Sequence, residues 1–195
     1  MRRKGPVARL AAAVPQYVNL AWHGLVVPKV RRREPPLVCQ AFVLSERGLL
    51  LSVRADLHGW ELPGGNAYPG ENDEEVLERE VREETGLRVE IESRVGDYRR
   101  TGFAAHTARV FACRVRGGVL RPSSETPIVA WFDPEDLPET LFPWYRVPIA
   151  DALARLPQPV ARQEHLGLAS VLAGMWIDVR MRSSNLRAGR VAGRR

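Results

Sequence analysis

The chain contains few of the residues that build cross-linked or cysteine-rich metal proteins. Only two of its 195 residues are cysteine. Cys39 and Cys113 both lie in apolar, strand-like runs, so a structural disulfide or a cysteine metal site is a poor fit, and two buried, reduced thiols are expected. Reduced thiols suit the cytosol, and we therefore expect a cytoplasmic protein.

Long hydrophobic runs are also lacking. A basic cluster precedes an apolar stretch over residues 7–27, as in a secretory leader, but Arg9, Pro15, Asn19 and His23 interrupt that stretch. A membrane-spanning helix needs about 20 apolar residues in succession. We therefore expect neither a cleaved leader nor a membrane span.

Lysine is scarce, with two residues against 27 arginines, and the basic charge is uneven. Residues 1–33 hold eight basic residues and no acidic one, residues 176–195 hold six arginines and Asp178, and residues 34–175 hold 15 basic against 22 acidic residues. Basic ends on an acidic body predict weak contact with RNA or with an anionic membrane surface, where the protein would be peripheral. Solvated tails are the simpler alternative.

Proline positions and apolar periodicity divide the chain into four parts. Residues 1–34 form a basic extension, in which apolar residues recur at helical spacing after Pro15. We expect residues 35–157 to form the central domain, residues 158–182 a C-terminal amphipathic helix, and residues 183–195 a basic, disordered tail. Packing on the domain, pairing in a homodimer and lying in a membrane interface are the alternatives for the two terminal helices.

Within the central domain, alternating apolar and polar residues predict strands. Gly117-Gly118 predicts a turn, and Pro148 begins a helix that runs to Leu156. Strands around one helix, with another helix later, fit an α/β sandwich. The expected strands cover residues 37–44, 49–54, 88–100, 105–116 and 128–132.

One helix is predicted over residues 73–85. Asn72 can cap its start, and Glu75, three residues later, completes a capping box. Gly86 stands where a helix ends in a left-handed residue. The local signals at both ends therefore agree on the bounds of this helix.

Three carboxylates, Glu80, Glu83 and Glu84, share one face of this helix because their spacing is i, i+3, i+4. Like charges at this spacing repel each other, and the helix dipole disfavours anions in the last turn. A cation is therefore expected, and carboxylate oxygens suit Mg²⁺, which prefers to share its site with substrate phosphates. A solvated acidic face is the simpler alternative, but it does not explain the glycines before the helix.

This helix and the loop before it resemble the signature of the Nudix hydrolases. The matching positions are Gly65, five residues, Glu71, seven residues, and Arg79-Glu80-Val81-x-Glu83-Glu84-x-Gly86-Leu87. Trp60-Glu61-Leu62-Pro63-Gly64 leads into this box as it does in many members. The resemblance is close over the box and loose over residues 37–155. It implies a Nudix-type α/β/α sandwich with a mixed sheet, carrying N- and C-terminal helical extensions.

The resemblance also implies metal ligands. In the family these come from glutamates of the box and from the carbonyl of the glycine before it, and the implied ion is Mg²⁺, with Mn²⁺ as a substitute. Carried over by position, the ligands are Gly64, Glu80, Glu83 and Glu84.

Further roles follow from the same resemblance. Arg79 would orient Glu80 by a charge-assisted contact, and Glu71 would brace the loop behind the ligands rather than bind the metal. The general base varies among members and is sometimes a glutamate in a later loop. Glu125 is the nearest candidate of that kind, and Glu80 is its main rival.

The implied activity is metal-dependent hydrolysis of a phosphoanhydride bond in a nucleoside diphosphate linked to another moiety, by attack of water at phosphorus. No added motif identifies which small-molecule nucleotide is the substrate. The alternative is a catalytically silent nucleotide sensor or scaffold, although such proteins generally lose box glutamates. The family's isomerases use a catalytic cysteine, and Cys39 lies too far before the box to fit that role.

Overall fold

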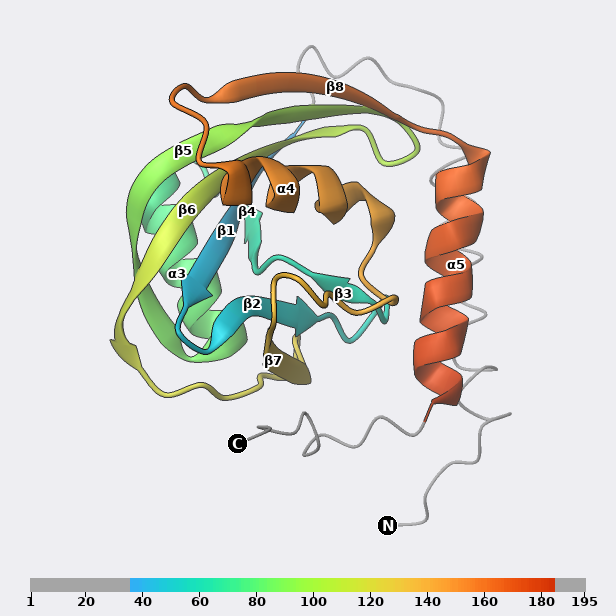
Figure 1. Ribbon diagram of the computed structural model, residues 1–195, viewed down its shortest axis with the longest axis horizontal. Coiled ribbons are helices and arrows are strands. Elements are labelled where there is room, and N and C mark those ends of the chain that lie inside the picture. The colour runs from blue at the N-terminus through green and yellow to red at the C-terminus, as the bar shows by residue number, and fades with distance from the viewer. Residues whose placement is uncertain (1–35, 185–195) are drawn as a thin grey trace.

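Helices cover both faces of one mixed β-sheet in the computed structural model, which describes residues 36–184 (Figure 1). The expected N-terminal helix and almost all of the expected basic tail lie outside these residues. The elements are β1 (Leu37–Ser45), β2 (Gly48–Val53), β3 (Trp60–Glu61), β4 (Gly64–Asn66), α3 (Asp73–Thr85), β5 (Leu87–Gly102), β6 (His106–Gly118), β7 (Ile128–Phe132), the 3-10 helix η2 (Pro143–Tyr145), α4 (Arg146–Ala154), β8 (Val160–Leu166) and α5 (Leu168–Ser183).

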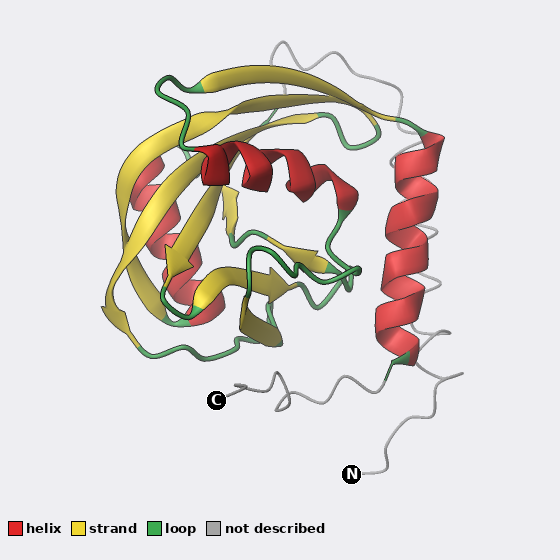
Figure 2. Cartoon of the chain, viewed as in Figure 1, coloured by secondary structure: helices red, strands yellow, loops and turns green. Residues whose placement is uncertain are grey.

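The sheet has the strand order β3-β2-β1-β6-β5-β8, with β4 also paired to β1 and β7 to β2. The pairs β1–β6 and β5–β8 are parallel, whereas β1–β2 and β5–β6 are antiparallel. Apolar residues of α3 enter a core on one face, and those of α4 enter a second core on the other. The two helices lie on opposite sides of the strands in Figure 2, which confirms the predicted α/β/α sandwich.

Helix α3 begins and ends where its capping residues predict. The Asn72 side chain accepts hydrogen bonds from the backbone of Glu74 and Glu75, and the Glu75 side chain accepts one from the backbone of Asn72. Gly86 ends the helix in the left-handed region, at a φ of 76°. These local bonds satisfy the free backbone groups of the helix ends.

The C-terminal part differs from the prediction of one helix over residues 158–182. Residues 160–166 form β8, which pairs in parallel with the second half of β5, and α5 begins only at Leu168. The long strand β5 offers a free edge that β8 satisfies, and such a non-local pairing overrides the helical spacing of apolar residues.

The packing face of α5 also differs from the predicted apolar stripe. Gly174, Ile177 and Met181 are buried, whereas several apolar residues at the expected helical spacing lie on the outer face. The exposed ones are Leu168, Leu172, Trp176 and Val179.

Gly117-Gly118 was wrongly predicted to form a turn. Both glycines belong to β6, where Gly118 faces Leu87 and Gly117 faces Arg88 in the antiparallel pair with β5. The register shifts just after Arg88, and the positive φ values of the two glycines accompany this irregularity. Glycine here marks a bulge within a strand rather than its end.

The remaining expectations concern the cysteines and the membrane. Cys39 and Cys113 are free and buried, as predicted. In the part of the chain that the structure describes, no helix combines the length and the apolar character needed to cross a membrane.

Candidate active site

A pocket of about 420 Å³ lies beside α3, where three loops meet its carboxylate face. The loop after β2, the strand β4 with the loop that follows it, and the loop before β7 all contribute to its wall. The lining residues are Arg54, Ala55, Asp56, Gly64, Gly65, Asn66, Tyr68, Glu80, Glu84, Ser124 and Glu125. Of the predicted site residues, the structure thus brings together Gly64, Glu80, Glu84 and Glu125.

Glu84 forms the buried side of this pocket. It is 8% exposed, and the backbone N–H of Gly64 donates to its Oε2 atom at 3.0 Å. Burial, followed by the nearby charges of Glu61 and Glu80, raises the pKa of Glu84 to about 8. Such crowding of buried carboxyl groups disfavours their charged form unless a cation compensates it.

Glu80 lies against the backbone of the glycine loop. A Cβ atom on Gly65 would stand 2.4 Å from the carboxylate carbon of Glu80, so a larger residue here would displace this carboxylate. Arg79 donates from Nη1 to Oε1 of Glu80 at 2.7 Å, which is the contact that the family resemblance implies. The Glu80 carboxylate is therefore held from two sides.

Arg79 is fixed by the loop that Glu71 braces. Its Nε and Nη2 atoms donate to the two carboxylate oxygens of Glu71 at 2.7 and 2.8 Å, and the Tyr68 ring lies 4.1 Å below its guanidinium carbon. The bond from Arg79, with one from the backbone of Tyr68, lowers the pKa of Glu71 to about 2. Glu71 does not line the pocket, and this position suits the bracing role predicted for it.

Two predicted residues lie further out. The Glu83 side chain is 56% exposed, stands 3.9 Å from Nη1 of Arg79, and does not line the pocket. Glu125 is exposed at the pocket rim, and its backbone carbonyl accepts a hydrogen bond from Ala55 at 2.7 Å. Among residues 36–184, no three acidic, histidine or cysteine side chains gather closely enough to form a metal cluster by themselves.

Glu61 was not predicted as a site residue. This buried carboxyl group accepts a hydrogen bond from the Tyr145 hydroxyl at 3.1 Å, and the same hydroxyl accepts one from Gln40. Burial raises the pKa of Glu61 to about 7, although Arg54 opposes the shift. The only signal in the sequence is a charged residue between the apolar Trp60 and Leu62.

Arg54 was also missed, and it brings positive charge to the pocket wall. Its Nε and Nη2 atoms donate to Asp56 at 2.8 and 2.6 Å, which lowers the pKa of Asp56. This pairing leaves Nη1 for an anion, and guanidinium groups bind phosphate oxygens well.

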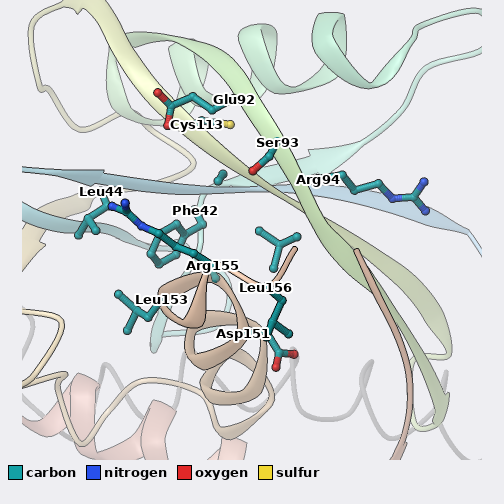
Figure 3. A pocket seen from close by; sticks show the side chains of 13 residues that line it. Phe42, Leu44, Glu92, Ser93, Arg94, Cys113, Asp151, Leu153, Arg155 and Leu156 are labelled. Atoms are coloured by element: carbon teal, nitrogen blue, oxygen red, sulfur yellow. The ribbon is translucent and has the colours of Figure 1, made fainter. Parts of the chain in front are cut away.

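A second cavity, of about 600 Å³, lies between the end of α4 and the sheet (Figure 3). Apolar residues such as Phe42, Leu153 and Leu156 line it, with Arg94 and Arg155 beside them. It shares no lining residue with the pocket beside α3. Glu80 and Glu84 therefore line only the pocket beside α3.

Comparison with known proteins places this geometry in a family. A family model described as NUDIX domain matches residues 35–152. A MutT-like protein of Streptomyces ambofaciens is 43% identical over 112 residues, which cover 57% of this chain and 72% of that protein. The human 8-oxo-dGDP phosphatase NUDT18 is 34% identical over 118 residues, or 56% of this chain and 36% of that protein.

A solved structure agrees with these relatives. An ADP-ribose pyrophosphatase from Streptococcus suis superimposes with a TM-score of 0.54 at 27% identity, covering 67% of this chain and 99% of that one. The family model matches more than half of the chain, and the chain therefore belongs to the Nudix hydrolases.

Proposed function

We propose that this chain is a metal-dependent pyrophosphohydrolase whose substrate is a nucleoside diphosphate linked to another moiety. The observation that carries the proposal is the buried Glu84 carboxyl group, which lines one pocket together with Glu80 and the glycine loop. A hard divalent ion fits such a group of carboxylate and carbonyl oxygens.

The residues present fit Mg²⁺ or Mn²⁺. Glu80 and Glu84, with the backbone of Gly64, would hold the ion, and Glu83 would reach it from the rim. When bound, such an ion neutralises phosphate charge and lowers the pKa of a water molecule.

The chain's own side chains would perform the other steps. Arg79 holds Glu80 in place, and Glu80 or Glu125 accepts the proton of the attacking water. Arg54 binds a phosphate oxygen of the substrate through its remaining N–H groups.

The names of two relatives indicate which nucleotides to test first as substrates. One is named an 8-oxo-dGDP phosphatase and another an ADP-ribose pyrophosphatase, so 8-oxo-dGDP and ADP-ribose come first. With Mg²⁺ or Mn²⁺ in isotope-labelled water, we expect one of these to yield a phosphate product that carries the label, because water attacks phosphorus. Label in a carbon-bound hydroxyl would contradict this mechanism, and tight binding without turnover would favour the nucleotide sensor.

The cysteine-dependent isomerase is a poor alternative. Burial and the neighbouring Asp73 raise the pKa of Cys39 to about 12, and its thiol donates to Asp73 at 3.5 Å. A thiol with such a pKa is not a thiolate at neutral pH and makes a weak nucleophile.

We also propose that the basic ends bring the protein to anionic lipid surfaces. The exposed apolar residues of α5, Trp176 among them, lie on one narrow stripe of the helix. An apolar stripe that carries an aromatic ring suits the interface of a membrane.

Replacing Arg31, Arg32 and Arg33 with glutamine in the full chain should weaken binding to phosphatidylserine vesicles by roughly a hundredfold at low salt, since each arginine near such a surface contributes about 1 kcal/mol. Turnover of a soluble nucleotide should not change. Vesicle sedimentation measures the binding, with phosphatidylcholine vesicles as the neutral control. Equal binding of both proteins to the anionic vesicles, or a preference for RNA, would contradict the proposal.

A further inference from the structure

Helix α5 lies beyond the part of the chain that the family model matches, yet it contacts the loop that carries Arg54. We propose that Asp178 and Arg182 are positioning residues, which hold this loop so that Arg54 faces the substrate. The proposal rests on the proposed function to the extent that the pocket binds a phosphorylated substrate.

The contacts between α5 and the loop are short, and the Asp178 side chain that makes one of them is buried. Asp178 Oδ1 accepts a hydrogen bond from the backbone N–H of His58 at 2.6 Å, and Arg182 donates from Nη2 to the backbone carbonyl of Asp56 at 2.8 Å. The Asp178 side chain is 0% exposed, and Arg182 donates to both of its carboxylate oxygens at 2.9 and 2.8 Å. The Asp178–Arg182 ion pair thus holds the loop at Asp56 and at His58.

The loop transmits this support to the pocket wall. The Asp56 residue whose carbonyl binds Arg182 also binds the Arg54 guanidinium through its carboxylate, and that carboxylate accepts the N–H of Leu57 as well. The neighbouring Ala55 donates to the carbonyl of Glu125 across the pocket mouth. Displacing Asp56 would therefore displace Arg54.

The helix is itself well anchored, as a support must be. Ile177 and Met181 belong to the same core cluster as Trp60 and Phe142. Close packing occurs at Gly174, where an added Cβ would lie 3.1 Å from the ring of Trp144. In Figure 1, α5 lies on the side of the molecule toward which the arrowhead of β2 points, where the loop to β3 begins.

The same contacts predict which kinetic constant, KM or kcat, depends on α5. The contacts that Asp178 and Arg182 make with the loop lead through Asp56 to Arg54. A displaced Arg54 binds the substrate phosphate less well, and equally so in the ground state and in the transition state. Such a loss raises KM and leaves kcat unchanged.

The kinetic test compares Arg182→Ala and Asp178→Asn with Arg180→Ala. Arg180 lies on the same helix but pairs with Glu139 on the surface, so it is a matched control. The first two variants should raise KM for the best substrate of the panel about tenfold, with kcat within about threefold of the wild type, and the control should change neither. With Arg54→Ala already present, Arg182→Ala should add little, because residues that act through one contact are not additive.

A second measurement works without any substrate. Hydrogen exchange of the segment 54–60 should be at least about tenfold faster in Arg182→Ala than in Arg180→Ala, while exchange in α3 stays the same. Equal exchange of this segment, or equal KM values, in Arg182→Ala and Arg180→Ala would overturn the proposal. If the wild type hydrolyses no nucleotide, the proposed function fails, and the exchange measurement still decides the role of α5.

Discussion

Replacing Glu80 with glutamine should lower turnover by at least about a hundredfold, the scale of a lost general base or metal ligand. Glutamine preserves the size of the side chain and its helix propensity, so α3 should still form. It cannot carry the charge that Arg79 pairs with at 2.7 Å, nor accept a proton from water. Nucleotide binding should survive better than turnover, because Arg54 and the pocket loops remain in place.

The comparison that makes this result specific is Glu78→Gln, which removes the same charge from an exposed position of the same helix. It should leave kcat within about twofold of the wild type, since surface charges away from the site have small effects. Arg79→Ala should act in the same direction as Glu80→Gln but more weakly, because it loosens the Glu80 carboxylate without removing it. A fully active Glu80→Gln variant in steady-state assays would exclude the proposed mechanism.

The features that the sequence predicts correctly are encoded locally. The bounds of α3 follow from Asn72, Glu75 and Gly86, which lie within one turn of its ends. The Arg79–Glu80 contact joins neighbouring residues, and Gly65 is explained by the carboxylate that packs on it. Short-range chemistry of this kind depends little on how the rest of the chain folds.

The features that the sequence missed depend on distant partners. Glu61 lies beside Glu84 only because β3 pairs with β2, and its hydroxyl partner Tyr145 is 84 residues away. The strand β8 forms because β5 has a free edge. Asp178 and Arg182 look like an ordinary i, i+4 surface pair, and only the folded chain brings them to a loop 120 residues earlier. The spacing of residue types along the sequence does not predict such long-range pairings.

Adding Mg²⁺ should raise the melting temperature of the wild type, and Glu84→Gln should lose most of that rise. An ion that binds only the folded state stabilises it by about 2.7 kcal/mol at a hundred times its Kd, which is roughly 5–10 °C for a chain of this size. Glu83→Gln is the matched comparison, because Glu83 carries the same charge on the same face but is 56% exposed. It should keep a larger part of the response.

Without metal, Glu84→Gln should have the opposite effect on the melting temperature. Because the pKa of Glu84 is raised from 4.5 to about 8 in the folded chain, the folded state holds a proton that the unfolded state releases over this range. The free energy of unfolding of the metal-free wild type should therefore fall as the pH rises from about 4.5 to about 8. Glu84→Gln carries no such proton, and glutamine can still accept the N–H of Gly64. Above pH 8, the metal-free variant should therefore melt at a higher temperature than the metal-free wild type, although Mg²⁺ stabilises it less. A variant that melts lower without metal and responds to Mg²⁺ like the wild type would remove Glu84 from the metal site.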